Sequence, residues 1–223
     1  MGFSIAIDGP AGAGKSTIAK LVAKRLGSIY IDTGAMYRTM ALYYMEKGID
    51  CTDIPAVVAE FPYIDIKLKH VDEVQHVILN GRDVSDLIRT QTVGDNASKV
   101  SAIAEVRTKL VALQREIASE INVVMDGRDI ASVVLPYAEL KIYLTASVEV
   151  RAKRRCAELI EKGQEADLKI IEQQIAERDY RDMHRDASPL VKVDDAVEID
   201  SSDMTIEEVT EKIISLADEA MNK

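Results

Sequence analysis

The chain has 223 residues, 47% of them hydrophobic, which is enough for one generous domain or for a core that carries an insertion. A formal net charge of −10 argues against a nucleic-acid-binding surface, so an anionic small ligand would have to be met by local arginines. Cys51 and Cys156 have no metal-binding or redox spacing, and no apolar run approaches about 20 residues. We therefore expect a soluble cytoplasmic protein without a nucleic-acid or membrane partner.

The first element is an apolar run, Ser4 to Ile7, which predicts a buried strand. Residues 9–16 then match the pattern G-x-x-x-x-G-K-[ST], and an amphipathic helix is predicted over 15–26, ending before Gly27. Strand, glycine loop and helix form the context in which backbone N–H groups and a helix N-terminus bind phosphate. A chance glycine turn is the alternative, but every position of the motif is filled. The stretch predicts a nucleotide phosphate site.

Two side chains of this loop have predicted tasks. Lys15 can reach the β- and γ-phosphates of a bound nucleotide, and the Ser16 hydroxyl is placed to coordinate Mg²⁺. The predicted ATP-binding residues are Gly9, Pro10, Ala11, Gly12, Ala13, Gly14, Lys15, Ser16 and Thr17.

The next elements continue the alternation and then interrupt it. Residues 29–31 predict a short strand, a helix runs to about Lys47, and a second, short helix is predicted through Phe61. Charged and apolar residues then alternate, and Asn80-Gly81 is a strong tight-turn signal between two further short strands. We interpret residues 62–92 as an antiparallel insertion.

The second half of the chain returns to strands that alternate with helices. We predict a long amphipathic helix over 97–119, strands at 123–125, 140–144 and 197–200, and helices at 147–162, 167–184 and 205–221. Five core strands, each too isolated for a hairpin, imply an α/β fold with a parallel sheet covered on both faces.

Charged residues gather at predicted strand ends. Asp126 directly follows an apolar strand, where phosphoryl-transfer enzymes keep an acidic residue near Mg²⁺, although a helix cap would also explain it. Arg128 shares this loop, and Arg38 follows a neighbouring strand. Two arginines near a phosphate loop can clamp a second phosphate, which indicates that the phosphoryl acceptor is itself anionic.

A second charged group lies in the run 177–185. Arg178, Asp182 and Arg185 fall on one face of the predicted helix. From the residues alone, a salt-bridge ladder and a functional site explain this run about equally well.

Five segments together resemble the bacterial cytidylate (CMP) kinase family, in order from residue 5 to about 200. The glycine loop is shared by many families, whereas the stretch from Asp32 to Arg38 and the Arg-Asp-rich run are specific. The insertion also resembles the extra antiparallel sheet of the long bacterial form. The segments are 6–16, Asp32-Thr33-Gly34-Ala35-Met36-Tyr37-Arg38, Ile88-Arg89-Thr90, Asp126-Gly127-Arg128-Asp129 and Glu177-Arg178-Asp179-Tyr180-Arg181-Asp182.

The resemblance implies a P-loop NTPase fold with a five-stranded parallel sheet between helices, a small antiparallel β insertion and a helical lid. Residues 1–223 would form one domain with a core (about 1–31, 120–150 and 186–223), a CMP-binding part (about 32–119) and a lid (about 151–185). The implied activity is transfer of the γ-phosphoryl group of MgATP to CMP, and we expect dCMP to be accepted as well. We expect a monomer.

The family pattern also implies a role for each matching residue. Cytosine contacts would come from Thr33, Arg107, Asp129 and Arg185, phosphate contacts from Arg38 and Arg128, and ribose contacts from Ser98, Arg178 and Asp182. The expected catalytic residues are Lys15, Arg38, Asp126, Arg128 and the lid arginines Arg154 and Arg155. Because some relatives have Gly at the position of Ser16, Thr17 is an alternative ligand of Mg²⁺, with Asp126 reaching the ion through water.

The chemistry of the base agrees with this implication. A carboxylate such as Asp129 suits the exocyclic amino group of cytosine, whereas uracil would place a carbonyl there. A kinase for UMP or AMP remains the nearest alternative. A nucleotide-binding switch is a second one, although the guanine-reading motif Asn-Lys-x-Asp does not occur in the chain.

Overall fold

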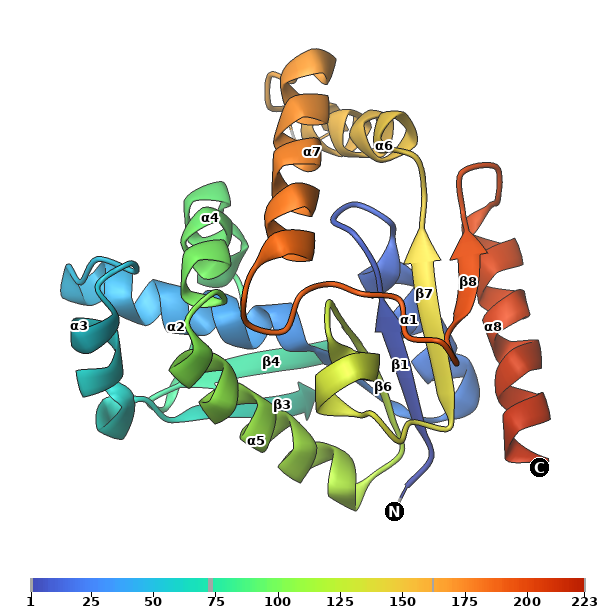
Figure 1. Cartoon of the computed structure of the whole chain (residues 1–223), viewed down its shortest axis with the longest axis horizontal. Coiled ribbons are helices and arrows are strands. Elements are labelled where there is room, and N and C mark those ends of the chain that lie inside the picture. The colour runs from blue at the N-terminus through green and yellow to red at the C-terminus, as the bar shows by residue number, and fades with distance from the viewer. Residues whose placement is uncertain (1, 72–73, 162, 223) are drawn as a thin grey trace. The chain divides into compact units, whose positions relative to one another are not determined.

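The computed structural model describes residues 2–71, 74–161 and 163–222. The chain divides into two compact units, which can be followed by colour in Figure 1. The first unit combines residues 1–30 with residues 120–223, and the second comprises residues 31–119. The second unit is therefore one continuous stretch that interrupts the first.

A five-stranded sheet in the order β2-β6-β1-β7-β8 forms the centre of the first unit. β1 pairs in parallel with β6 on one side and β7 on the other, and β7 pairs in parallel with β8. The loop after β1 thus opens at a topological switch point, where open α/β sheets bind their ligands. The strands are Ser4–Asp8 (β1), Ile29–Asp32 (β2), Val123–Gly127 (β6), Leu140–Thr145 (β7) and Val197–Asp200 (β8).

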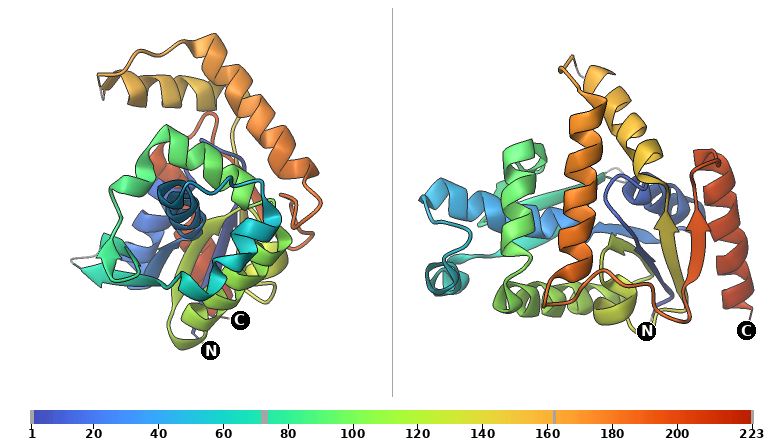
Figure 2. Two further views of the ribbon diagram at one scale, coloured as in Figure 1. Left: turned by 90° about the vertical axis from the view of Figure 1, so that its left-hand side faces the viewer. Right: turned by 45° about the horizontal axis from the view of Figure 1, so that its top comes forward.

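The described part of the first unit contains four α-helices. α1 (Lys15–Leu26) and α8 (Ile206–Met221) pack against each other and bury apolar residues against the sheet. α6 (Val148–Glu161) follows β7 and packs against α7 (Leu168–His184) through a small separate core, and both views in Figure 2 show this helix pair. In Figure 1 the arrowheads of β7 and β8 point toward α6, so α6 lies beyond the carboxyl ends of these strands.

The second unit has its own core. A three-stranded antiparallel sheet in the order β3-β4-β5 contacts α2, which in turn packs against α4. Fully buried side chains such as Met36, Met40, Tyr44 and Leu110 fill the space between these elements. The elements are α2 (Thr33–Lys47), α3 (Ile54–Ala59), β3 (Ile66–Val71), β4 (Val74–Leu79), β5 (Arg82–Asp83), α4 (Gln91–Val100) and α5 (Ala104–Glu120).

The predicted α/β class, the five-stranded sheet and the antiparallel insertion are confirmed. The single helix predicted over 97–119 is wrong, because α4 ends at Val100 and α5 begins at Ala104. The Ser101 hydroxyl donates to the Ser98 carbonyl, and the Arg107 guanidinium donates to the Ser101 carbonyl, so local hydrogen bonds close the first helix.

Other boundaries differ by a few residues. The short helix expected to reach Phe61 ends at Ala59 and is followed by a 3₁₀ turn over Phe61–Tyr63. The helix predicted over 147–162 was expected to end at residue 162, which lies outside the described residues. None of the helices in the described ranges combines the length and the apolar character needed to span a membrane.

Candidate active site

The loop between β1 and α1, residues 9–14, is called the phosphate loop below. Gly9 has a φ of +148°, and a Cβ there would lie 1.9 Å from the Leu144 carbonyl oxygen of β7. No residue with a side chain fits this position, because β1 and β7 approach too closely. The glycine that opens the motif is therefore required by the packing of the sheet at its carboxyl edge.

Lys15 begins α1 and is only 6% exposed, and its Nζ donates a 2.7 Å hydrogen bond to the Pro10 carbonyl. Burial, together with the positive charge of Arg128, lowers the pKa of the Lys15 ammonium well below its ordinary value. A bound polyanion would offset both effects. The position of Lys15 thus favours a ligand that carries several negative charges.

Ser16 and Asp126 meet at the carboxyl edge of the sheet. The Ser16 hydroxyl donates to Asp126 Oδ2 at 2.8 Å, and the Tyr30 hydroxyl donates to Asp126 Oδ1 at 2.9 Å. A hydroxyl and a carboxylate are hard oxygen donors of the kind that Mg²⁺ prefers. Within the described residues, no group of three or more His, Cys, Asp or Glu side chains forms an all-protein metal cage. The donor set suits an ion that takes its other ligands from phosphate and water.

Asp8 was not singled out by the sequence, yet it positions the loop that follows β6. It is 2% exposed and accepts hydrogen bonds from the backbone N–H groups of Ile130 and Ala131 at 2.9 and 2.7 Å. These amides begin a π-helical turn, Ile130–Val134, directly after Asp129. Burial raises the pKa of Asp8 to about 6, against the lowering effect of the two amide hydrogen bonds.

The raised pKa of Asp8 has a consequence for stability. Because the folded protein holds this proton more tightly than the unfolded chain, the free energy of unfolding falls as pH rises from about 4 to about 6. We expect wild type to lose up to about 3 kcal/mol relative to Asp8→Asn across this window. Chemical denaturation of both proteins at several pH values measures the difference. Parallel stability curves would contradict the assignment.

Arg128 and Asp129 form one charged cluster with three residues of α7 and its C-terminal end, Arg178, Asp182 and Arg185. Arg128 Nε donates to Asp182 Oδ2 at 2.9 Å, and Arg185 Nη2 lies 3.9 Å from Asp129 Oδ1. Burial alone would raise the pKa of Asp182, but Arg128, with Arg178 and Arg185, outweighs it and lowers that pKa. The positive charges of Arg128 and Arg178 also lower the pKa of Lys15, so the cluster interacts electrostatically with the residue that follows the phosphate loop.

The two arginines expected to act from the lid have other partners in this structure. Arg154 donates to the hydroxyl and the carbonyl of Ser201 at 3.1 and 2.6 Å, in the loop after β8. Arg155 pairs with Glu158 one turn along α6 at 2.9 Å. Among the described residues, the phosphate loop is held instead by Arg151 and Asp179, two residues that the sequence did not single out.

The second unit contains the other predicted site residues. Thr33 is 3% exposed at the start of α2, and Arg38 Nη2 pairs with Asp32 Oδ2 at 2.7 Å. Gly34 makes room for this pair, because a Cβ there would lie 3.0 Å from the Arg38 guanidinium. Ser98 lies on α4, and Arg107, which is 4% exposed, lies on α5 with its guanidinium 5.3 Å from the centre of the Tyr37 ring.

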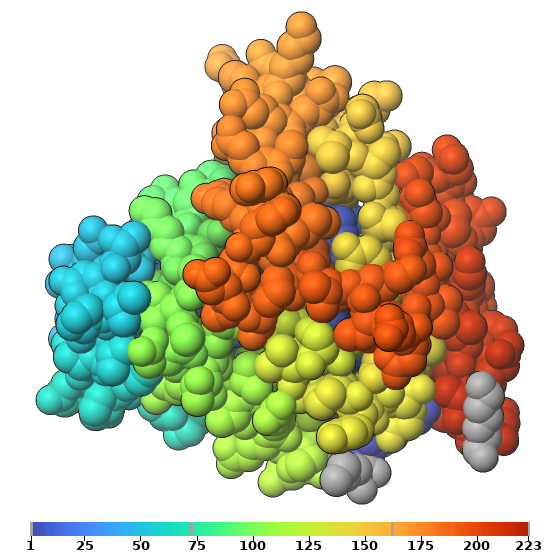
Figure 3. Space-filling view, viewed as in Figure 1, coloured from blue at the N-terminus to red at the C-terminus, as the bar shows by residue number. Residues whose placement is uncertain are grey.

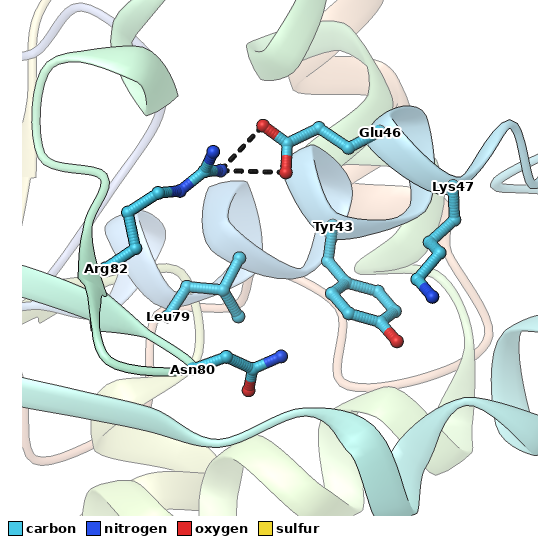
Figure 4. Close-up of a pocket in the computed structure, with 6 residues that line it drawn as sticks. All are labelled: Tyr43, Glu46, Lys47, Leu79, Asn80 and Arg82. Carbon is cyan, nitrogen blue, oxygen red and sulfur yellow. Dashed lines mark hydrogen bonds and ion pairs between the residues drawn. The ribbon is translucent and has the colours of Figure 1, made fainter.

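A cavity of about 280 Å³ also lies in the second unit, between the end of α2 and the β4–β5 turn (Figure 4). The figure shows Arg82 and Glu46 bonded to each other, with Arg82 Nη2 donating to the two Glu46 carboxylate oxygens at 2.6 and 2.7 Å. The Asn80 side chain is bonded to the backbone of Tyr63 and Asp65. Arg82, Glu46 and Asn80 are thus paired within the unit, and none of the predicted site residues lines the cavity.

Comparison with known proteins gives concordant matches. A family model described as cytidylate kinase matches residues 5–219. Cytidylate kinases from Lactobacillus johnsonii and Caldicellulosiruptor saccharolyticus are each 51% identical to this chain over 214 residues, which cover 96% of it and 93% and 95% of those proteins. A solved gluconokinase from Sinorhizobium meliloti 1021 has a TM-score of 0.51 at 16% identity, covering 99% of this chain and 94% of that one, which shows a shared fold.

Proposed function

The chain belongs to the cytidylate kinase family, and we propose that it transfers the γ-phosphoryl group of ATP to CMP, giving ADP and CDP. One observation supports this reaction above all. The phosphate loop with Lys15 and the Arg128–Asp182 cluster lie in one unit and share one electrostatic field, so a donor and an anionic acceptor can both be bound there. We propose that dCMP is a substrate as well.

The donor half of the reaction is assigned to the phosphate loop. Lys15 would leave the Pro10 carbonyl and bind the β- and γ-phosphates of ATP. Ser16 would hold Mg²⁺, with Asp126 reaching it through water and Thr17 as the alternative hydroxyl. When bound, the ion neutralises charge on the phosphate oxygens. Arg154 and Arg155 are proposed to reach ATP only after leaving Ser201 and Glu158.

The acceptor half is assigned to arginines that the family pattern implies. Arg128 and Arg38 would bind the CMP phosphate, and each is already oriented by a carboxylate, Asp182 and Asp32 respectively. No general base is needed, because the CMP phosphate attacks as an ionised oxygen. Catalysis then consists of alignment and charge neutralisation. The proposed base and ribose contacts are Thr33, Ser98, Arg107, Asp129, Arg178, Asp182 and Arg185.

The parts of the chain receive corresponding roles. We propose that the second unit is the CMP-binding part and that α6 and α7, within about 151–185, act as the lid of a core formed by the rest of the first unit. We also propose that the protein works as a cytoplasmic monomer on free nucleotides, since its net charge of −10 disfavours nucleic acid.

A substrate panel tests the function. Coupled detection of ADP release with CMP, dCMP, UMP, AMP and GMP as acceptors should give the highest kcat/KM for CMP or dCMP. ADP release that does not depend on an acceptor, or a clear preference for UMP or AMP, would overturn the proposal.

The choice of base makes a sharper prediction. Asp129 is 4% exposed, and its carboxylate would accept from the amino group of cytosine. Asp129→Asn should therefore weaken transition-state binding of CMP by about 1–3 kcal/mol, measured as the fall in kcat/KM. UMP should gain relative to CMP, because the new amide can donate to the uracil carbonyl. Arg185→Ala should weaken both pyrimidines, since they share the O2 acceptor. Equal losses for CMP and UMP in Asp129→Asn would rule out this reading of the base.

A further inference from the structure

Two charged residues that the proposed reaction does not use hold the tip of the phosphate loop. Arg151, near the start of α6, donates from Nη1 to the Ala11 carbonyl at 2.9 Å, and Asp179 on α7 accepts from the Ala11 N–H at 3.4 Å. Arg151 Nη1 and Asp179 Oδ2 form an ion pair of 2.6 Å. In Figure 3, blue atoms from the start of the chain are visible beside the gold of α6 and the orange of α7. Both polar groups of one loop residue are therefore bound by one ion pair.

This ion pair is not a surface feature. Arg151 is 4% exposed and Asp179 is 7% exposed, and Arg151 Nε is fixed by a 2.8 Å hydrogen bond to the Ala146 carbonyl. The stem of Arg151 also covers Gly12, where a Cβ would lie 3.3 Å from Arg151 Cβ. Burying two charges costs free energy, so a hydrophobic pair would serve simple packing at least as well. The charges are used to bind backbone groups of the loop.

Peptide geometry shows what this binding determines. In a planar trans peptide the C=O and the following N–H point in opposite directions. With the Ala11 carbonyl held by Arg151, the Gly12 N–H must point away from Arg151. With the Ala11 N–H held by Asp179, the Pro10 carbonyl points away from Asp179, and there it accepts from Lys15. Arg151 and Asp179 thus set the orientation of two successive peptide planes.

We propose that Arg151 and Asp179 are positioning residues that orient the peptide planes on either side of Ala11 so that the phosphate loop is preformed for ATP. This inference rests on the proposed function only in taking ATP as the ligand of the loop. The contribution of Asp179 is largest when Lys15 leaves the Pro10 carbonyl to bind a phosphate. Asp179 then holds the peptide plane between Pro10 and Ala11 without the hydrogen bond from Lys15. Neither residue needs to touch the nucleotide.

Binding of ATP without acceptor tests this role directly. Isothermal titration with MgATP should show Kd raised about tenfold or more in Arg151→Gln and Asp179→Leu. Asp179→Asn, which keeps an acceptor for the Ala11 N–H, should lose less than Asp179→Leu. Because the two residues act as one pair, the double variant Arg151→Gln/Asp179→Asn should lose less than the product of the single losses. Arg25→Gln, which removes the exposed ion pairs of Arg25 with Glu207 and Glu211, is the matched control and should bind ATP as wild type does.

Kinetics separate positioning from simple structural support. The variants should raise KM for ATP and leave KM for CMP within about twofold, at temperatures well below their Tm. Arg151→Lys keeps the charge but lacks the planar fork, so it should rescue Tm more than it rescues ATP affinity. Unchanged ATP affinity in Arg151→Gln, or equal losses for ATP and CMP that follow the loss in Tm, would overturn the proposal. A wild-type protein that binds ATP but does not phosphorylate CMP would instead contradict the proposed function and leave this test intact.

Discussion

Replacing Lys15 by methionine is expected to lower kcat on the order of 10²- to 10³-fold, because the preformed positive charge at the phosphate loop is lost. Methionine retains the apolar stem, and the buried ammonium that it replaces is already costly to keep charged. The variant should therefore fold with a Tm no lower than that of wild type. Steady-state ADP release at saturating CMP, together with thermal unfolding, measures both effects.

The matched control for this variant is Lys20→Met. Lys20 lies on the same helix, but it is exposed, and its ammonium lies 5.6 Å from the centre of the Tyr30 ring. This control should retain kcat within about twofold. A folded Lys15→Met protein that turns over at more than a third of the wild-type rate would show that the loop lysine does not carry the reaction.

Replacing Arg128 by methionine should lower kcat/KM for CMP on the order of 10²- to 10³-fold, since the proposed phosphate ligand disappears. It should also destabilise the fold, because the Asp182 carboxylate, whose side chain is 8% exposed, loses its 2.9 Å partner. Breaking a buried pair in this way costs about 3–5 kcal/mol. Kinetics with varied CMP and chemical denaturation report the two losses separately.

A double variant distinguishes catalysis from stability at this position. In Arg128→Met/Asp182→Asn the carboxylate that lost its hydrogen-bonded partner is also removed, so most of the lost unfolding free energy should return while CMP phosphorylation does not. If activity returned together with stability, Arg128 would be a structural partner of Asp182 and not a ligand of the acceptor phosphate.

The elements predicted best were those with local signals. α1 begins at Lys15 and ends at Leu26 as predicted, because the phosphate loop precedes it and Gly27 ends it in a left-handed conformation. The Asn80-Gly81 turn likewise placed β4 and β5 correctly. By contrast, the apolar stripe continued across residues 101–103, and the sequence carries no glycine or proline to mark the break between α4 and α5.

The residues that the sequence missed depend on contacts between distant parts of the chain. Asp8 binds amides more than 120 positions away, and Arg151 reaches Ala11 across 140 positions. Such partners are backbone groups, which have no residue-specific signature. Asp8 could still have been noticed, because it is an aspartate at the end of a fully buried strand, where an unpaired carboxylate would be costly.

The division of the chain also determines the order in which its parts can be completed during synthesis. The elements from α2 to α5 that build the core of the second unit lie within residues 33–120, so this core is complete before β6 has been made. β1 is in the opposite situation, since both of its neighbours, β6 and β7, lie in residues 123–145. The strand that precedes the phosphate loop is therefore synthesised more than a hundred residues before either strand that pairs with it. Because β1 is short, Ser4–Asp8, it exposes little apolar surface before β6 and β7 have been synthesised.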